Sequence, residues 1–512
     1  MWRKYKYRCF YLSLLFFLCI LVSRLMKQNG EKPKSWVNLE YVAVHFDLKG
    51  TPPKLAYLES LLPTLSVYGV NAIVVEYEDM FPYEGNILNV SAVNAYKRSD
   101  LLRFINFARY LDIQIIPLIQ TFGHMEYVLK YEEFAYLREK ENFPADICPS
   151  NPWTRKLITT MLQQVIDLHS TKYPLQHIHI GCDEVRKINV CPKCKRRRLE
   201  NTVLFAKHVE EVTSIIRELS PTTNVLIWSD MIQEYAYTKK HRKLFSDNVE
   251  AVAWEYGAYP QFSHKNFYNL HKNFKNIWIA SAYKGADGRD ATLPKIKHRF
   301  LNHLSWMKFI LGYKFGGESR VYNFKGIILT GWSRYSHMAP QCEILPLALP
   351  SLILNLLLIR TVKTGFDQGD LDILNYCEFF RKYFSKEFSD IFHNYNDTDE
   401  ECAFENTFLY EAHETLFDLT LFNECLSDLH KHESACRKGG TYVDEAAIEI
   451  SLEQCRNALK KFTEIKKNME AIMSEYYKKL VVNSYIHDIV KVPVDKVKRI
   501  INYLKNCTKH RY

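Results

Sequence analysis

Short apolar runs alternate with longer amphipathic stretches along the chain from about residue 40. Each run is β-branched or apolar almost throughout, which is typical of parallel strands buried on both faces. The stretches between them repeat their apolar residues at the helical period. The pattern predicts eight strands, at residues 41–46, 71–77, 113–119, 177–181, 224–230, 249–256, 277–283 and 326–332.

This alternation of strand and helix predicts a TIM (β/α)8 barrel over residues 39–366. A doubly wound sheet is the alternative, but it would require a glycine-rich turn after the first strand. The sequence HFDLKGTPP follows that strand instead, and neither a GxGxxG motif nor a P-loop motif occurs in the chain. Helices are predicted between the strands, for example at 54–68, 99–111, 152–169 and 202–218.

Strand patterns disappear after about residue 366, and only helical periods follow. We therefore expect an all-helical C-terminal domain over residues 367–512. Its segment near 445–480 is long, which suggests a packing role or a homodimer interface. The predicted helices lie at 370–392, 403–435, 444–480 and 494–506.

The N-terminus predicts a membrane anchor. Residues 9–23 are uncharged, and the apolar stretch continues to residue 26 if Arg24 reaches the membrane surface, so we expect a transmembrane signal anchor over 9–26. A cleaved signal peptide is the alternative, but no small-x-small cleavage site precedes Lys27.

Basic residues before the span favour type II topology, with residues 1–8 as a cytosolic tail and 27–38 as a short lumenal stem. A span this short suits a Golgi membrane better than the plasma membrane. We therefore expect a single-pass protein of the secretory pathway whose catalytic domain is lumenal.

Composition and charge narrow the function classes. A chain of 512 residues with 47% hydrophobic and 25% charged residues excludes disordered, collagen-like and small disulfide-rich proteins. The net charge is +10, but residues 1–34 alone contribute +7, because they hold eight basic residues and one acidic residue. The remainder is nearly neutral, so a nucleic-acid partner is not expected.

Cysteines and sequons bear on the compartment. The chain has thirteen cysteines, of which eleven follow the predicted span, and an odd number cannot pair completely within one chain. Cys191 and Cys194 have the spacing of a zinc knuckle, but no second such pair completes four ligands, so no metal is expected there. A local disulfide and two free thiols both remain open. N-glycosylation is expected at Asn89, Asn396 and Asn506.

Acidic and aromatic residues gather where the predicted strands end, which is where a barrel of this type holds its active site. Aromatic faces pack against the C–H groups of a sugar ring, and carboxylates accept hydrogen bonds from its hydroxyls. The sequence therefore predicts a sugar pocket. Its expected binding residues are Asp47, Glu78, His124, Glu126, Trp228, Asp230, Trp254, Tyr283 and Trp332.

Asp183 and Glu184 follow the fourth predicted strand and constrain the mechanism. Neighbours in sequence project differently, so this pair could not readily straddle a glycosidic bond as nucleophile and acid. If the sugar carries a 2-acetamido group, its carbonyl oxygen can attack the anomeric carbon instead. Asp183 would then orient the amide, and Glu184 would act as general acid and base. Two close carboxylates are expected to raise the pKa of one of them.

The sequence HIGCDEV at 179–185 resembles the catalytic motif of glycoside hydrolase family 20. The resemblance implies a retaining β-N-acetylhexosaminidase without metal or cofactor, with Asp183 orienting the amide and Glu184 as acid and base. It also places His124, Glu126, Trp228, Asp230, Trp254 and Trp332 around the sugar, with Tyr283 bound to the acetamide carbonyl. Supporting segments lie at 45–54, 76–85, 117–130, 228–231, 280–286, 326–335 and 342–352.

Two departures from the family pattern stand out. The arginine that grips sugar hydroxyls at the end of the first strand in lysosomal members has no counterpart in HFDLKG, so Asp47 or the acidic cluster 76–79 is expected to replace it. Ser336 stands where relatives tend to carry Asp. We expect an enzyme that removes terminal β-linked GalNAc or GlcNAc from glycoconjugates, and the alternative is a catalytically weak glycan-binding member of the family.

Overall fold

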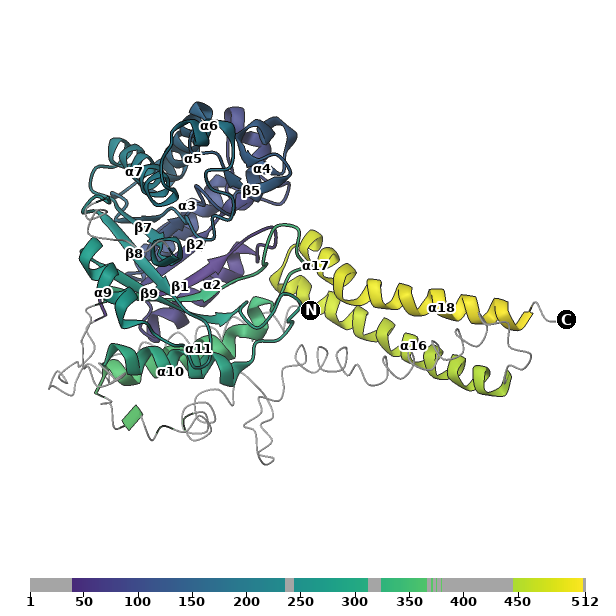
Figure 1. Ribbon diagram of the computed structural model, residues 1–512. Coiled ribbons are helices and arrows are strands. Elements are labelled where there is room, and N and C mark those ends of the chain that lie inside the picture. The colour runs from purple at the N-terminus through teal and green to yellow at the C-terminus, as the bar shows by residue number, and fades with distance from the viewer. Residues whose placement is uncertain are drawn as a thin grey trace.

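The computed structural model describes residues 39–234, 244–311, 324–365 and 445–509, together with residues 370, 371, 374 and 379. Its centre is a closed parallel barrel in the order β1-β10-β9-β8-β7-β6-β3-β2 (Figure 1). All eight predicted strands are confirmed, with small shifts at their ends. They are β1 (Tyr41–Asp47), β2 (Ala72–Glu76), β3 (Gln114–Leu118), β6 (His177–His179), β7 (Asn224–Trp228), β8 (Val249–Trp254), β9 (Ile277–Lys284) and β10 (Gly326–Gly331).

Helices surround the barrel, and the four that the sequence analysis placed between strands are confirmed. Local sequence sets their starts: α5 begins at Pro152 because the Asn151 side chain accepts a hydrogen bond from the Trp153 backbone N–H at 3.2 Å. The helices are α2 (Leu55–Val67), α3 (Arg98–Tyr110), α5 (Pro152–His169), α7 (Asn201–Leu219), α8 (Asp230–Glu234), α9 (His264–Asn273), α10 (Ile296–Ile310) and α11 (Leu345–Lys363).

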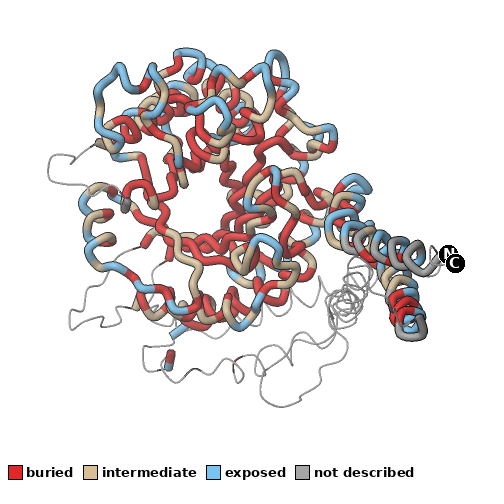
Figure 2. The backbone as a smooth tube through the Cα atoms, turned by 45° about the vertical axis from the view of Figure 1, so that its right-hand side comes forward, coloured by how far each residue is buried: buried red, intermediate tan, exposed pale blue. Residues whose placement is uncertain are grey.

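The barrel strands bury both of their faces. Every residue of β2 and of β10 is buried, as the uninterrupted apolar runs predicted. Figure 2 shows the buried backbone of the strands inside a shell of helices with exposed outer faces. The residues that fill the barrel interior include Ala43, Val74, Leu118, Leu226, Trp278 and Ile328.

Additional short elements lie in the loops that follow the strands. The loop between β3 and α5 carries α4, η3 and an antiparallel β4–β5 hairpin, and the loop between β6 and α7 carries α6. These elements are too short to display a period, so the sequence pattern did not predict them. Their bounds are η1 (Glu78–Met80), η2 (Gly85–Val90), α4 (Glu126–Leu129), η3 (Glu132–Leu137), β4 (Arg138–Lys140), β5 (Phe143–Ile147) and α6 (Pro192–Arg196).

The described C-terminal segment is helical, as expected. It consists of α16 (Glu445–Tyr476), α17 (Lys479–Ile486), the π-helical turn η5 (His487–Lys491) and α18 (Val492–Lys509). α16 and α18 lie side by side and extend away from the barrel (Figure 1). The helices predicted at 370–392 and 403–435 lie outside the described residues, apart from isolated positions, and the domain boundary at 366 stays a prediction.

The C-terminal helices attach to the barrel at the junction of α16 and α17. The Lys54 backbone N–H donates to the Tyr476 carbonyl oxygen at 2.7 Å, and the Leu345 N–H donates to the Tyr477 hydroxyl at 3.1 Å. An apolar cluster covers the contact, so these helices and the start of α11 share one core. Its members include Ile344, Leu347, Met469, Met473, Tyr477, Val481, Tyr485 and Ile486.

Among the residues that the structure describes, α11 is the one helix long and apolar enough to cross a membrane. It packs as the last outer helix of the barrel, with 83% of its most apolar stretch buried inside the molecule. The predicted cytosolic tail, anchor and stem, residues 1–38, lie outside the described residues.

Candidate active site

A cavity of about 260 Å³ opens among the loops that follow the barrel strands. Its position agrees with the expected place of a barrel active site. Of the predicted site residues, His124, Asp183, Glu184, Trp228, Trp254 and Trp332 line it. The other lining residues are Lys49, Glu76, Gln120, Tyr256, Gly285, Ala286, Arg334 and Tyr335.

A strained turn after β6 presents the two adjacent carboxylates. Gly181, Cys182 and Glu184 have left-handed backbone angles, with φ of 69°, 69° and 43°. A β-carbon at Gly181 would also collide with the Gln120 side chain, so glycine is required there. Strain of this kind is retained where the surroundings enforce it. One such restraint is the Glu184 backbone N–H, which donates to Asp230 Oδ2 at 2.8 Å.

His124 contacts both carboxylates of the pair. Its Nε2 lies 3.3 Å from Asp183 Oδ2 and 3.5 Å from Glu184 Oε2. Burial alone would lower the pKa of His124, but the charge of Asp183 and the hydrogen bonds to both carboxylates outweigh burial and raise it well above its usual value. Gln120 Nε2 donates to Asp183 Oδ1 at 3.1 Å, so both oxygens of Asp183 are held by protein groups.

The two carboxylates differ in exposure and in their partners. The Asp183 side chain is 11% exposed, whereas the Glu184 side chain is 40% exposed. Arg186 donates to Glu184 Oε2 at 2.8 Å. The hydrogen bond to His124, followed by its charge and the contact with Arg186, lowers the pKa of Glu184 to about 2. The expected rise in the pKa of one member of the pair is therefore not found at Glu184.

A raised pKa is found instead at a neighbouring carboxyl group, Asp230. Burial, followed by the charge of Asp183, raises the pKa of Asp230 to about 7. Asp230 does not line the cavity, but it accepts hydrogen bonds from the Glu184 backbone N–H and from Trp254 Nε1, the latter at 3.4 Å. It therefore supports the carboxylate turn and one aromatic wall.

Aromatic rings form the walls of the cavity. The Trp228 and Trp332 ring centroids lie 5.8 Å apart, and Trp254 stacks on Tyr256 at 5.1 Å. Trp228 is almost fully buried, whereas Trp254, Tyr256 and Trp332 are partly exposed to the opening. Such a set of aromatic faces suits the C–H surface of a sugar ring, as the strand-end pattern predicted.

A buried lysine lies just past the end of β1, where this chain lacks the arginine of the lysosomal family members. Lys49 Nζ lies 3.3 Å from Glu78 Oε1, 3.7 Å from Asp47 Oδ2 and 4.0 Å from Glu76 Oε1. Burial alone would lower the pKa of Lys49, but these carboxylates raise it well above its usual value. The acidic residues here were expected to bind the sugar and Lys49 was not, although Lys49 stands two residues past β1 in the same HFDLKG segment.

Four further predicted binding residues do not line the cavity. Asp47 accepts from the Ser333 N–H at 2.8 Å, Glu78 contacts His337, and Glu126 begins α4 with 9% exposure. Tyr283 is fully buried, and its hydroxyl donates to the His45 carbonyl oxygen at 3.3 Å. They surround the lining residues, so direct sugar contact by these side chains stays a prediction.

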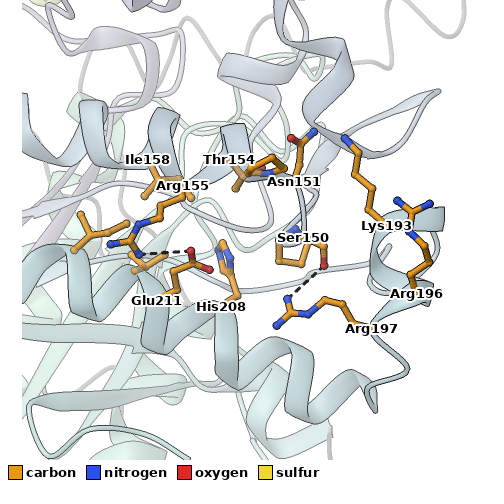
Figure 3. A pocket seen from close by; sticks show the side chains of 14 residues that line it. Ser150, Asn151, Thr154, Arg155, Ile158, Lys193, Arg196, Arg197, His208 and Glu211 are labelled. Atoms are coloured by element: carbon orange, nitrogen blue, oxygen red, sulfur yellow. Dashed lines mark hydrogen bonds and ion pairs between the residues drawn. The ribbon is translucent and has the colours of Figure 1, made fainter.

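A larger cavity of about 560 Å³ lies elsewhere, between α5, α6 and α7 on the outside of the barrel. Figure 3 shows its charged lining, in which Arg155 contacts Glu211 and Arg197 contacts Ser150. Its walls contain neither the carboxylate pair nor the tryptophans of the smaller cavity. The smaller cavity is therefore the candidate active site.

Comparisons with known proteins agree with this geometry. Hexosaminidase D of Bos taurus is 38% identical over 317 residues, which make up 60% of this chain and 89% of the bovine protein. Hexosaminidase D of Homo sapiens is 36% identical over 333 residues, covering 64% of this chain and 66% of the human protein.

A solved structure supports the same fold. The crystal structure of a β-N-acetylhexosaminidase matches with a TM-score of 0.53 at 14% identity, covering 78% of this chain and 87% of that chain. Residues 62–271 match the model of the glycosyl hydrolase family 20 catalytic domain. The chain, which is similar to hexosaminidase D, therefore belongs to glycosyl hydrolase family 20.

Proposed function

We propose that the protein is an exo-acting β-N-acetylhexosaminidase that removes terminal β-linked GalNAc or GlcNAc from glycoconjugates. The observation that carries the proposal is the adjacent pair Asp183 and Glu184, both in contact with His124 in a tryptophan-walled cavity. The cavity volume of about 260 Å³ lies just below the roughly 300 Å³ lower bound of typical ligand pockets. It therefore suits one terminal ring rather than an internal segment of a glycan.

The difference in exposure supports different roles for the two carboxylates. Asp183 is buried and held by Gln120 and His124, so it can accept the amide N–H of a bound 2-acetamido group in a fixed position. It then stabilises the positive charge that develops on the oxazolinium ring. Glu184 is the more exposed of the two, so it can reach the oxygen that departs with the rest of the glycan.

The reaction proceeds in two steps with overall retention. The acetamide carbonyl oxygen bonds to the anomeric carbon while the glycosidic C–O bond breaks and the departing oxygen takes the proton of Glu184. Water then attacks the same carbon while the bond from that carbon to the oxazolinium oxygen breaks and restores the acetamide, and Glu184 takes a proton from this water. Glu76 also lines the cavity, but its two carboxylate oxygens contact His45 and Gln120, so it is poorly placed to act as a nucleophile.

The remaining lining residues bind the ring. Trp228, Trp254 and Trp332 pack against its C–H faces, and Lys49 takes the hydroxyl-binding role of the missing arginine. We assign the contact with the acetamide carbonyl to Tyr256, which lines the cavity, rather than to Tyr283, whose hydroxyl is bound to His45.

Hydrolysis of aryl β-GalNAc and β-GlcNAc by the purified full-length protein tests the proposal. We expect turnover of at least one sugar by the wild type and a loss of about 10²- to 10⁴-fold in Glu184→Gln with an ordinary aryl leaving group. The kcat/KM of Glu184→Gln should fall much less on a dinitrophenyl glycoside, because kcat/KM reports the first step and that leaving group needs little protonation. The kcat/KM of Asp183→Asn should fall by a similar factor on both substrates, because both require attack by the acetamide oxygen.

The control for this experiment is Glu211→Gln, which removes an exposed carboxylate from α7 and should leave turnover unchanged. An NMR spectrum of the first-formed sugar should show the β-anomer, and an initial α-anomer would contradict the retaining mechanism. If the wild type binds both sugars but hydrolyses neither, the protein is the glycan-binding alternative.

We also propose that the catalytic domain lies in the lumen of the Golgi, held by an N-terminal signal anchor over residues 9–26. The uncharged run 9–23 and the basic residues before it support this topology. Asn89 is exposed, so its sequon is accessible for glycosylation. In intact microsomes, protease should spare the catalytic domain, and Asn89→Gln should remove one glycan. Digestion of the domain without detergent would contradict the proposed topology.

Homodimer formation through the C-terminal helices remains part of this proposal. α16 and α18 extend away from the barrel and carry exposed apolar residues such as Ile450 and Val492. Light scattering of the detergent-solubilised protein should give the mass of two chains. The mass of one chain at micromolar concentration would contradict the dimer.

A further inference from the structure

Three cysteines and one glutamate converge beside the active site. Ligand atoms of Glu139, Cys148, Cys191 and Cys194 all lie within 4.8 Å of one another. Cys148 Sγ is 3.4 Å from Cys191 Sγ and 3.7 Å from Cys194 Sγ, and Cys194 Sγ is 3.2 Å from Glu139 Oε2. Glu139, Cys148 and Cys194 are buried, and Cys191 is partly exposed.

The fold assembles this cluster from two loops. Glu139 lies on β4 and Cys148 directly follows β5, both in the loop after β3, whereas Cys191 and Cys194 flank the start of α6 in the loop after β6. The Cys191–Cys194 pair alone did not predict a metal site, because the sequence has no second pair of this kind to supply the two other ligands. The structure supplies the two remaining ligands singly, from residues more than forty positions earlier in the chain.

We propose that Glu139, Cys148, Cys191 and Cys194 bind one structural Zn²⁺ ion. Zinc prefers four ligands in a tetrahedron, with Zn–S distances of about 2.3 Å, which place two bound sulfurs roughly 3.8 Å apart. The two sulfur–sulfur distances of 3.4 and 3.7 Å are close to this spacing. Thiolate-rich tetrahedral sites select zinc over the magnesium and calcium that carboxylates alone would favour.

Surrounding groups orient the ligands as the outer contacts of metal sites do. The Val190 and Cys191 backbone N–H groups donate to Glu139 Oε1 at 2.7 and 2.9 Å, which turns Oε2 toward the sulfurs. The Cys194 N–H lies 3.3 Å from Cys191 Sγ. Ser150 Oγ lies 3.1 Å from Cys194 Sγ and so adds a further contact to this ligand.

The chemistry of the cluster favours a metal over a disulfide. A disulfide could join only two of the three sulfurs, and it would leave a thiol beside the buried Glu139 carboxylate. Within the described part of the chain, no lysine, arginine or histidine forms an ion pair with Glu139. Figure 3 shows cationic side chains on the α6 side of the neighbouring cavity, where Arg197 contacts Ser150. Such cations offset the negative charge of a thiolate-rich zinc site.

The ion would hold the two loops of the active site together, a consequence that rests on the proposed function. The β4–β5 hairpin contacts the His124 segment, because the Met125 N–H donates to the Ala145 carbonyl oxygen at 2.8 Å. It also contacts the loop of the carboxylate pair, because the Lys187 N–H donates to Asp146 Oδ2 at 2.6 Å. Four protein ligands leave zinc no open position, so its role is structural rather than catalytic.

Metal analysis of the full-length protein, purified under reducing conditions without chelator and then dialysed with zinc, tests this site independently of activity. We expect about one zinc per chain in the wild type. Cys194→Ala and Glu139→Ala should bind much less, and Cys342→Ser, which removes a buried free thiol outside the cluster, should bind as the wild type does. Cobalt in place of zinc should give the charge-transfer and visible bands of a tetrahedral thiolate site.

A second measurement on the wild type does not depend on whether the variants fold. Zinc should protect Cys148, Cys191 and Cys194 from alkylation, and removal of zinc by a chelator should expose Cys191 first, since it is the least buried of the three. Absence of bound zinc and cobalt in a folded wild-type protein would overturn the proposal. A disulfide from Cys148 to either partner, found by peptide mapping of protein isolated without reductant, would overturn it as well.

Discussion

At the scale of single residues, the low pKa of Glu184 conflicts with its proposed role as general acid. A general acid must hold a proton, but the contacts with His124 and Arg186 lower the pKa of Glu184 to about 2. When activity is measured as kcat/KM, the part that depends on protonated Glu184 is lost as the pH rises through the pKa of Glu184 in the free enzyme. The proposed acid role therefore requires that bound substrate weaken these contacts. Arg186 is the partner most easily displaced, because its side chain is 64% exposed.

Arg186→Gln should move the alkaline limb of the pH–activity profile to higher pH. Removing the guanidinium removes a positive charge that favours the ionised carboxylate, so the pKa of Glu184 rises and the acid form persists further. The measurement is kcat/KM against pH, with Arg155→Gln on α5 as a matched control, because it removes a similarly exposed arginine. A limb that stays in place in Arg186→Gln would show that Arg186 does not set the protonation state of Glu184.

At the scale of elements, the strand and helix pattern predicted the barrel but not the side-chain positions at its mouth. Most of the eight strands were predictable because they are apolar on both faces over several residues, as β2 and β10 are. The hairpin β4–β5 and helix α6 were not, because elements of three to five residues show no period. The proposed zinc ligands Glu139 and Cys148 lie on or next to that hairpin, so the sequence pattern could not place them beside Cys191 and Cys194.

The residues of the active site were also only partly predictable from the sequence. Trp228, Trp254 and Trp332 were predictable because large aromatic residues at strand ends have few other reasons to be there. The sugar contact of Tyr283 stays a prediction: its hydroxyl donates to the His45 carbonyl oxygen of β1, and its side chain does not line the cavity. Lys49 was missed because a lysine in a loop is usually solvated. Only the fold shows three carboxylates around it.

The contact between α11 and the C-terminal helices gives a prediction at the scale of elements. Leu345 begins α11, and its N–H, which has no partner within the helix, donates to the Tyr477 hydroxyl at 3.1 Å. Tyr477→Phe removes this acceptor and leaves a buried donor unpaired, so the free energy of unfolding should fall by about 1–3 kcal/mol. Urea unfolding followed by tryptophan fluorescence measures the change.

The matched control for Tyr477→Phe is Tyr110→Phe, because the Tyr110 side chain is 79% exposed at the end of α3. This variant should change the free energy of unfolding by less than about 0.5 kcal/mol. Equal effects of the two substitutions would mean that the Tyr477 hydroxyl does not stabilise the contact between the C-terminal helices and the barrel.

At the scale of the whole molecule, two sets of buried ionisable groups have opposite effects on how the stability of the fold depends on pH. Burial raises the pKa values of three carboxyl groups to about 7, so they stay protonated in the folded chain at mildly acidic pH. Burial lowers the pKa values of six histidines to about 3 or 4, so they stay neutral when folded. The carboxyl groups are Asp146, Asp230 and Glu343, and the histidines are His169, His177, His179, His208, His303 and His337.

Below pH 6.5 the effect of the histidines should exceed that of the carboxyl groups, so the free energy of unfolding should fall as the pH is lowered. A histidine with a lowered folded pKa stabilises above its unfolded value of 6.5, and this contribution is lost as the pH falls toward the folded pKa. A carboxyl group with a raised folded pKa stabilises at low pH and loses its contribution as the pH rises toward 7. Among the described residues, the unfolded chain gains protons near pH 5 at these six histidines and at His271, whose pKa burial also lowers. The folded chain retains protons at the three carboxyl groups and at Glu78, whose pKa burial also raises.

Each net proton corresponds to about 1.4 kcal/mol per pH unit, so the thermal midpoint should be clearly lower at pH 5 than at pH 7. His303→Gln should weaken this pH dependence, because it removes one buried titrating group, and His487→Gln should not, because the His487 side chain is 55% exposed. A midpoint that rises toward pH 5 would show that the buried carboxyl groups dominate and that the fold suits a strongly acidic compartment. A falling midpoint is the behaviour of a protein that works near neutral or mildly acidic pH, as the proposed Golgi location requires.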